Sequence, residues 1–407
     1  MIIQYSIHQV SPFSALRSRK SPVGTMKELN SILTAFAESQ HNGEKSFLAT
    51  VVNVQGSTYR QPGARMLITS TGEMVGTISG GCLENDILEH THVSIADGKP
   101  IVVTYDTTAE EDIIWGFGLG CNGVVKILIE PLNSDNPLNP LAFINQCFRN
   151  QQPGIIATVI SVEGTVNIQV GERLTLKLDH SINTDIQEAY LTNSLTKDAR
   201  TCLQNQNSSF HKYQLELSKI DVFMEFIQPP PHLIIFGAGR DSVSVAEFAK
   251  ALGWRVTIVD CRANEVSNQR FPMADEVMLT RREILHEQMC INNYIAAVVM
   301  THNYLDDLEI LKMLIPTNIS YLGCLGSKKR IAKLLQDLST QGVEYSQKGL
   351  QKLHAPVGID IGADTPEAIA LSIIAEIQAV LANRDGGFLK HRTEPINQPN
   401  PVREIEI

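Results

Sequence analysis

The chain has 407 residues, of which 43% are hydrophobic and 19% are charged, and this ordinary mixture excludes wholesale disorder. Its 34 lysine and arginine residues against 44 aspartate and glutamate residues give a formal net charge of −10. Such an acidic chain disfavours broad binding to nucleic acid or to an anionic membrane, although a small basic pocket for one phosphate stays compatible with it.

No segment is predicted to cross a membrane or to direct secretion. The longest plainly apolar run, about Tyr294–Met300, suits a buried strand rather than a bilayer span. The first twenty residues carry their charges after their apolar residues, which is the wrong order for a secretory signal. The seven cysteines include no zinc-type pair, so we expect reduced thiols in a cytoplasmic protein.

The first half of the chain is predicted to form an α+β domain over residues 26–228, after an irregular lead-in over residues 1–25. In chain order it contains a helix (26–40), a strand (47–54), a turn-rich loop with a short strand, a Gly-rich segment, a helix from about Gly81, and strands over 101–106 and 122–132. A helix (141–150), a strand (155–162) and a polar helix (near 184–205) follow. No function is assigned to residues 131–227.

Pro229–Pro231 marks the clearest domain boundary, because three prolines break any regular element and stiffen a connection. Beyond it strands alternate with helices, a pattern typical of a parallel sheet with crossover helices. The predicted fold class is therefore α/β, with a C-terminal Rossmann-like domain over residues 229–387. The polar, Pro-containing segment 388–407 is predicted to be a loose tail.

A dinucleotide-like turn opens this second domain. Gly237 and Gly239 follow a predicted strand and begin a helix, and Asp260 closes the next strand. The glycines allow a tight turn and a close phosphate, and the acidic residue would hold ribose hydroxyls. Ser242 replaces the third glycine of the usual pattern. The layout predicts a Rossmann fold, and leaves open whether it binds NAD(P) or another nucleotide or keeps an empty or repurposed site.

Two segments of the first domain place a cysteine in a Gly-rich loop. Cys82 follows Gly80 and Gly81 near the start of a predicted helix, and Cys121 lies within Gly118–Gly123. Gly-rich loops bring backbone N–H groups close to a ligand, and the helix dipole favours the thiolate form of Cys82. A thiolate is a soft metal ligand. Each cysteine is equally compatible with a small buried residue.

These segments carry a family resemblance. The first domain contains GSTYRQPGARMLITSTGEMVGTISGGCLENDI and GLGCNG, and the second contains LIIFGAGRDSVSVAEFAKALGWRVTIVD, VVMTHNYLDDLEIL, YLGCLGSKKR and LHAPVGIDIGADTPEAIALSIIAEI. In this order they resemble the XdhC/CoxI family over about three quarters of the chain. The resemblance implies a non-catalytic chaperone that binds the molybdenum cofactor, supports its sulfuration and hands it to the apo-enzyme of a xanthine dehydrogenase-type molybdenum hydroxylase.

The residues expected to contact such a cofactor follow from its pterin, phosphate and dithiolene-bound molybdenum. Cys82 is the first candidate and a candidate molybdenum contact, Gly80 and Gly81 are candidate backbone donors, and Cys121 comes second. Arg60 and Arg65 lie in a polar loop and could reach phosphate or pterin, or could brace the loop. His302 follows a predicted strand at the edge where α/β ligands bind, and a structural histidine fits there equally.

Two other functions remain open at this point. An NAD(P)-dependent oxidoreductase would use the Rossmann domain, with His302 as acid or base. A thiol redox sensor would use Cys82 and Cys121, if both are close in space and have lowered pKa values. A homodimer and a cysteine desulfurase partner are further expectations, and no nucleic-acid or membrane partner is expected.

Overall fold

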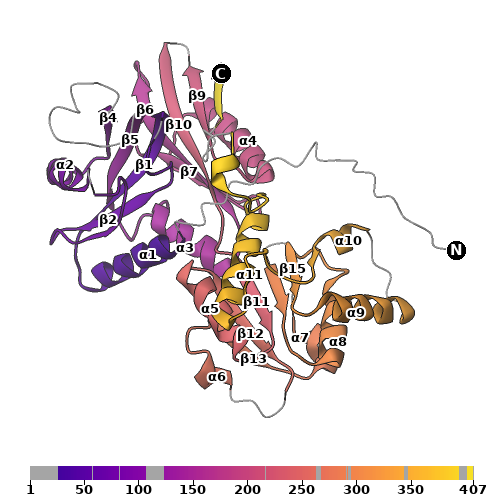
Figure 1. Ribbon diagram of the computed structural model, residues 1–407. Helices are drawn as coiled ribbons and strands as arrows, with labels where there is room; N and C mark the ends of the chain where they lie inside the picture. The colour runs from indigo at the N-terminus through magenta and orange to yellow at the C-terminus, as the bar shows by residue number, and fades with distance from the viewer. Residues whose placement is uncertain are drawn as a thin grey trace.

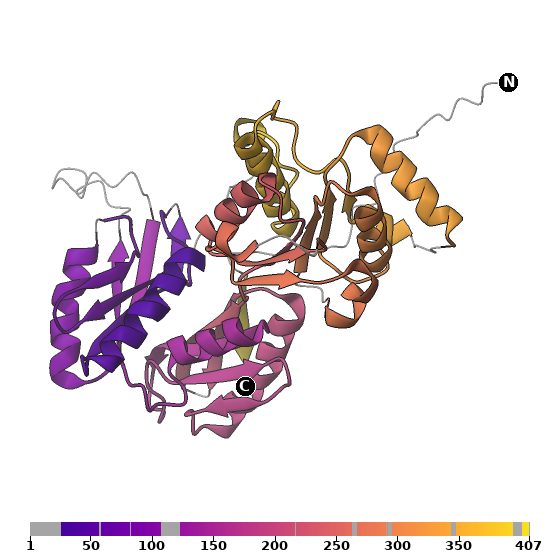
Figure 2. The same cartoon turned by 90° about the horizontal axis from the view of Figure 1, so that it is seen from below.

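The computed structural model of the chain describes residues 26–56, 58–81, 83–106, 123–215, 217–262, 267–289, 291, 295–342, 347–393 and 401–406. These residues form three sheets, which we call sheets A, B and C in chain order (Figure 1). Figure 2 shows them as three separate groups, with sheet A in indigo and purple, sheet B in magenta and pink, and sheet C in orange. The predicted α/β fold class is confirmed.

Sheet A is antiparallel and has the strand order β3-β2-β1-β5-β4. Its elements are α1 (Met26–His41), β1 (Ser46–Gly56), β2 (Arg65–Thr69), β3 (Met74–Gly76), α2 (Glu84–Asp97), β4 (Ile101–Asp106) and β5 (Gly123–Leu132). Strand β1 is buried on both faces, because Leu48 packs with Ile32 of α1 while Phe47 packs with Ile87 of α2. This alternation places α1 and α2 on opposite faces of the sheet.

Sheet B has the order β17-β9-β10-β6-β7-β8 and is antiparallel except for β17, which pairs parallel to β9. Its strands are β6 (Gly154–Glu163), β7 (Arg173–Lys177), β8 (Ile182–Thr184), β9 (Ser209–Leu215), β10 (Ser218–Ile227) and β17 (Val402–Glu406). The helices of this part of the chain are α3 (Pro140–Asn150) and α4 (Ala189–Asn205). Leu191, Leu195 and Ala199 recur every four residues along α4, so one helical face covers the sheet.

Two parts of sheet B differ from the sequence-based expectation. Residues 163–227 contain β7, β8, β9 and β10, where only a polar helix was predicted. The segment expected to be a loose tail supplies β17, which pairs with β9 from Val402 opposite Phe210 to Glu406 opposite Gln214. An edge strand with exposed polar side chains lacks the continuous apolar run by which a buried strand is recognised.

Two buried ion pairs tie sheet A to sheet B. Arg65 of β2 contacts Glu225 of β10, and Arg173 of β7 contacts Glu130 of β5. A shared apolar cluster lies between the sheets and includes Val52 from β1. Buried ion pairs and apolar packing therefore join the two sheets within residues 26–227.

Sheet C is parallel throughout, with the order β13-β12-β11-β14-β15-β16. It contains β11 (His232–Phe236), α5 (Asp241–Ala251), β12 (Arg255–Asp260), α6 (Ser267–Arg270), β13 (Glu276–Leu279), η3 (Arg282–Ile284), α7 (Leu285–Gln288), β14 (Ile295–Val299), α8 (Tyr304–Leu314), β15 (Tyr321–Cys324), α9 (Lys328–Thr340), α10 (Gln347–Gln351), β16 (Leu353–His354), α11 (Pro366–Leu381) and η4 (Leu389–His391). Counted from β11, this is the 3-2-1-4-5-6 order of a Rossmann fold, whose switch point lies between β11 and β14.

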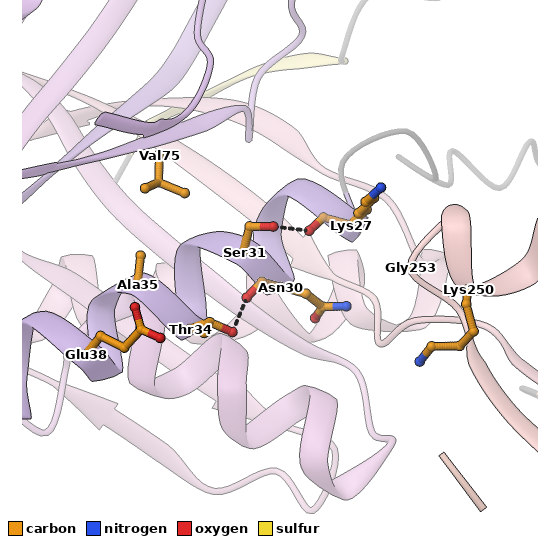
Figure 3. A pocket seen from close by; sticks show the side chains of 9 residues that line it. All are labelled: Lys27, Asn30, Ser31, Thr34, Ala35, Glu38, Val75, Lys250 and Gly253. Atoms are coloured by element: carbon orange, nitrogen blue, oxygen red, sulfur yellow. Dashed lines mark hydrogen bonds between the residues drawn. The ribbon is translucent and has the colours of Figure 1, made fainter. Parts of the chain in front are cut away.

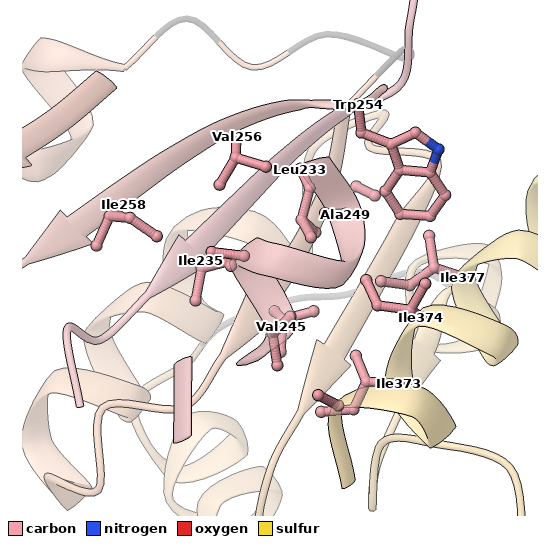
Figure 4. Close-up of a cluster of buried hydrophobic side chains, with 14 of the residues drawn as sticks. Leu233, Ile235, Val245, Ala249, Trp254, Val256, Ile258, Ile373, Ile374 and Ile377 are labelled. Carbon is pink, nitrogen blue, oxygen red and sulfur yellow. The ribbon is translucent and has the colours of Figure 1, made fainter. Parts of the chain in front are cut away.

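Helices cover both faces of sheet C. Helices α5 and α11 pack on one face, where the fully buried Trp254 lies against Leu233 and Ile377 (Figure 4). Helices α8 and α9 pack on the other face through Leu311 and Leu334. Among the described residues, no helix has both the length and the apolar character that a bilayer crossing requires.

Candidate functional site

The Gly-rich loop between β3 and α2 is organised around one carboxylate, that of Glu84. Its Oε1 accepts hydrogen bonds from Thr77 Oγ1 (2.6 Å) and Ser79 N (3.1 Å), and Ser79 Oγ donates to Oε2. Further backbone N–H groups donate to the same carboxylate from Ile78, Gly81 and Leu83. The loop therefore wraps around an acidic side chain of its own helix.

The Glu84 carboxyl is held in its ionised form. Its partial burial alone would raise the pKa, but the hydrogen bonds from Ser79 and Thr77 outweigh burial and lower the pKa to about 2. Glu84 also lies in the first turn of α2, where the helix dipole favours a negative charge. A permanently charged acceptor thus fixes the shape of the loop.

The predicted backbone donors of this loop already have partners within the protein. Gly80 N donates to Thr77 Oγ1 at 3.1 Å, and Gly81 N donates to Glu84 Oε2 at 3.0 Å. Both glycines have positive φ, of 95° and 113° respectively, which favours residues without a side chain. Neither N–H group is therefore free for a ligand, and of the two residues Gly81 is the one that leaves room for a ligand to approach. Cys82 and Cys121 lie outside the described residues, so their predicted roles stay predictions.

A second loop, between β1 and β2, is pinned against the first. Glu28 of α1 accepts a hydrogen bond from Thr77 N at 2.6 Å and also forms an ion pair with Arg60. The neighbouring Tyr59 ring lies against Gly80, where an added Cβ would come within 2.9 Å of Tyr59 Cε1. The sequence did not single out Glu28, Tyr59 or Glu84. The partners of Glu28 and Tyr59 lie on other segments of the chain, whereas those of Glu84 lie within its own loop.

Arg65 occupies a bracing position rather than an open surface. Its side chain is 4% exposed and forms a bidentate ion pair with Glu225, in which Nη1 donates to Oε1 at 2.8 Å and Nη2 donates to Oε2. Nη1 also donates to Gly63 O at 2.8 Å. Of the two alternatives expected for Arg65, this geometry favours the bracing one, because the guanidinium is buried against Glu225 and its unpaired Nε is buried as well. Arg60 is likewise committed to Glu28.

The dinucleotide-like turn has the expected backbone at its first glycine. Gly237 has a φ of 119°, and an added Cβ would come within 2.5 Å of Met300 O, so only glycine fits there. Ser242, at the position of the third glycine, is fully buried and donates to Gly237 O at 2.6 Å. The serine therefore closes the turn from within, and the substitution is compatible with the fold.

The charges at this turn differ from those of an ordinary phosphate site. Asp241 stands in the first turn of α5, and its Oδ2 lies 3.3 Å from His302 Nε2. A carboxylate at this helix N-terminus occupies the place that favours an incoming anion. The Asp260 carboxylate is 2% exposed and accepts hydrogen bonds from Arg262 N and Nε at 3.1 and 3.0 Å.

The loop that carries His302 is fixed by charge pairs which the sequence did not reveal. Asp307 is 1% exposed and accepts hydrogen bonds from Thr301 Oγ1 (2.5 Å) and Arg330 Nη2 (2.6 Å). Asp306 accepts from Arg282 at 2.9 Å. Both acids lie in the first turn of α8, and their arginine partners come from η3 and α9. Among the described residues, no group of three or more His, Cys, Asp or Glu is arranged to hold a metal.

A shallow hollow of about 480 Å³ is lined by residues of α1 and of the α5–β12 turn (Figure 3). Three of its polar side chains have partners: Ser31 Oγ donates to Lys27 O, Thr34 Oγ1 donates to Asn30 O, and Lys250 contacts Asp275. None of the predicted site residues lines this hollow. The structure places the Gly-rich loop between β3 and α2 beside sheet A and the dinucleotide-like turn on sheet C, as two distinct regions.

The sequence as a whole matches known proteins. Residues 39–106 match the model of the XdhC and CoxI family, and residues 233–377 match that of the XdhC Rossmann domain. A relative from Bacillus subtilis (strain 168), named as a probable xanthine dehydrogenase subunit, is 31% identical over 352 residues, which are 86% of this chain and 97% of the relative. The chain belongs to the XdhC and CoxI family. This confirms the resemblance drawn from the motifs.

Two further proteins resemble this member of the XdhC and CoxI family over most of its length. The molybdenum cofactor insertion chaperone PaoD of Escherichia coli (strain K12) is 23% identical over 355 residues, 87% of this chain and 89% of PaoD. A crystal structure from Bacillus halodurans, described as a xanthine dehydrogenase, superposes with a TM-score of 0.69 at 27% identity, covering 90% of this chain and 98% of that one.

Proposed function

We propose that this protein is an accessory protein that binds the molybdenum cofactor and delivers it to a xanthine dehydrogenase-type molybdenum hydroxylase. The observation that carries the proposal is the match of 86–87% of the chain to two relatives, one named for xanthine dehydrogenase and the other for molybdenum cofactor insertion. In this view the cofactor is a cargo rather than a resident group, and the protein acts without catalysing a reaction of its own.

The Gly-rich loops of sheet A are the proposed cargo site. Gly80 carries the Tyr59 ring, and a Cβ on Gly81 would meet no described atom within 4 Å, so a ligand can approach the loop closely at Gly81. Cys82 follows directly in the sequence, and its thiolate would offer the soft ligand that suits molybdenum. We include Cys121 as a second thiol. Arg60 would reach the cargo phosphate only by leaving Glu28, and Arg65 would act by bracing the site.

The finer steps of the proposal concern sulfuration and transfer. A cysteine desulfurase would supply the sulfur of the terminal sulfido ligand while the cargo is held, and the apo-hydroxylase would then receive the finished cofactor. Such a sequence requires an opening at the loops through which both partners can reach the metal. A homodimer and a cytoplasmic location complete the proposal.

Cofactor retention is the test. The purified protein is incubated with molybdenum cofactor released from a molybdenum hydroxylase, passed through a gel-filtration column, and assayed for the fluorescence of the oxidised pterin. We expect about one pterin per chain in the protein fractions, and the elution volume reports the oligomeric state. Retention no better than that of an unrelated protein of similar charge would overturn the proposal.

The variant Cys82→Ser separates the role of the thiol from the function as a whole. We expect it to lose most of the retained cofactor while the fold, followed by far-ultraviolet circular dichroism, stays unchanged. Cys147→Ser is the matched control, because Cys147 is a buried thiol whose pKa burial raises to about 12. Undiminished retention by Cys82→Ser would remove this cysteine from the site and leave the accessory function standing.

A nicotinamide dinucleotide site on sheet C is the second candidate. The Rossmann strand order and the buried Asp260 at the end of β12 favour it. Asp241 opposes it, because its carboxylate stands at the helix terminus that would meet the pyrophosphate. A fluorescence titration with NADH and NADPH tests the site. Saturable binding that increases in Asp241→Asn would support it, and no binding to either protein would dismiss it.

A further inference from the structure

The candidate cargo site carries an exposed aromatic ring that the proposed function does not yet use. Tyr59 lies between β1 and β2 and is 68% exposed. Its ring nevertheless lies against Gly80. A Cβ added to Gly80 would come within 2.9 and 3.0 Å of two carbons of the ring. One side of the ring therefore covers the Gly-rich loop, while most of the side chain stays accessible.

The surroundings of Tyr59 hold both loops in place. Arg60, the next residue, is anchored to Glu28, and Glu28 also accepts the Thr77 N–H of the opposite loop. Thr58 Oγ1 donates to Arg60 O at 2.9 Å, which closes the turn around the tyrosine. The backbone on either side of Tyr59 is thus held in place, so less backbone freedom remains to be lost when a ligand covers the ring.

We propose that Tyr59 is an aromatic platform on which the flat pterin ring of the cargo stacks. This inference rests on the proposed function and assigns the part of the cargo that the β1–β2 loop recognises. A fused heteroaromatic ring matches a tyrosine face in shape, and such stacking tolerates changes at the ring edge. Next to the ring, a Cβ added to Gly81 would meet no atom of the described residues within 4 Å, so the loop surface beside Tyr59 is open.

Other exposed aromatic residues lack this setting. Tyr190 is 74% exposed, but it lies in the first turn of α4, beside sheet B. Phe388 is 77% exposed and packs edge-on against His391, with Lys390 over its ring. Of these three residues, Tyr59 is the one that lies against a glycine of the candidate cargo site. Tyr190 therefore serves as the control for an exposed tyrosine that lies outside this site.

The experiment measures cofactor affinity by ultrafiltration and pterin fluorescence in the full-length chain and its variants. The probe is molybdenum cofactor released from a molybdenum hydroxylase. We expect Tyr59→Ala to weaken binding about tenfold, the loss typical of one base–aromatic stack, and Tyr59→Phe to stay within about twofold of the parent. Tyr190→Ala should bind like the parent protein.

Gly80→Ala gives an independent test, because the added Cβ forces the tyrosine ring away while the phenol itself is kept. We expect it to weaken binding about as much as Tyr59→Ala. Gly43→Ala is its control, since Gly43 also has a positive φ, of 71°, and an added Cβ there meets no atom within 4 Å.

The outcomes separate the platform from the function. Equal binding by the parent and Tyr59→Ala would refute the platform while leaving the accessory function intact. A parent protein that does not retain cofactor would refute both. Equal losses in Tyr59→Ala and Tyr190→Ala would also refute the platform, because the effect would then not depend on location. Circular dichroism and thermal unfolding of each variant show whether a loss reflects binding or folding.

Discussion

At the scale of single residues, Glu84 does more to shape the candidate site than any glycine around it. One carboxylate satisfies donors from Thr77 to Leu83, so the loop keeps its form without a ligand. Such a preformed loop avoids an ordering cost on binding. This arrangement also makes the loop depend on ionisation, because a protonated carboxyl accepts fewer hydrogen bonds.

Glu84→Gln should therefore destabilise the protein at neutral pH, and the destabilisation should become smaller as the pH falls below 4.5. The folded pKa of about 2 lies below the ordinary value of 4.5, so the stabilisation is complete above about pH 4.5 and is lost as the pH falls towards 2. We expect a loss of about 1–2 kcal/mol at pH 7, reduced from the full shift because solvent screens the half-exposed group. Urea unfolding of both proteins at pH 7, 5 and 3.5 measures it. A difference that is the same at all three values would contradict the assignment.

Arg65→Met tests the bracing role. It leaves Glu225 buried without its cation, and a loss of about 3–5 kcal/mol in unfolding free energy is expected. The double variant Arg65→Met, Glu225→Leu should regain most of that stability and should bind cofactor like the parent protein. Lys212→Met, which breaks an exposed pair with Glu404, serves as the control and should change stability by under about 0.5 kcal/mol. Weak cofactor binding by the stable double variant would restore Arg65 as a cargo contact.

At the scale of elements, the contact between α1 and the α5–β12 turn joins sheet A to the Rossmann domain. Gly253 has a φ of 79°, and an added Cβ would come within 2.5 Å of Lys27 N. The turn and the start of α1 approach each other at backbone distance, which leaves no room for a side chain.

Gly253→Ala should cost at least about 1 kcal/mol more than Gly342→Ala. Both glycines have a positive φ, so both variants carry the left-handed strain of about 1–2 kcal/mol, but a Cβ on Gly342 meets no atom within 4 Å. Urea unfolding measures the difference, and amide hydrogen exchange should show faster opening of α1 in Gly253→Ala alone. Equal costs and equal exchange would mean that the close approach at Gly253 does not hold the two elements together.

Elements whose residues are local in sequence were predictable, and contacts between distant segments were not. The turn from Gly237 to Asp260 combines a strand, glycines and a helix within one stretch, and its fold was confirmed. Arg65 and Glu225 lie 160 positions apart, and nothing in either sequence segment points to the other. The same holds for Glu28 with Thr77. The packing of the two loops against each other depends on such long-range pairs, while the shape of the Gly-rich loop depends on the local hydrogen bonds to Glu84.

At the scale of the whole molecule, β17 connects the region after the Rossmann domain to sheet B. It covers the edge of β9, and Ile405 adds to the apolar cluster under α4 while Val402 is 59% exposed. An uncovered β-strand edge offers unpaired backbone groups to a second chain. The pairing therefore stabilises sheet B, and it makes β17 the outermost strand, whose charged side chains such as Arg403 and Glu404 disfavour pairing with a second chain.

Removing residues 401–407 should lower the unfolding free energy by about 1–2 kcal/mol and cause concentration-dependent self-association. Light scattering after gel filtration measures the association, and urea unfolding measures the stability. Glu404→Ala is the control, because it removes only an exposed pair with Lys212 and keeps the strand. A shortened protein with the parent's mass and stability would show that β17 adds neither stability nor protection.

The place of β17 in sheet B also sets an order of events during synthesis. A ribosome makes residues 140–227 first, then the whole of sheet C, and only afterwards the segment that completes the edge of β9. The outer edge of β9 therefore stays unpaired while more than 170 residues, from 228 to 401, are added to the chain. A nascent chain that stalls within the Rossmann domain would expose this edge, giving quality-control proteins a ready signal that synthesis is unfinished.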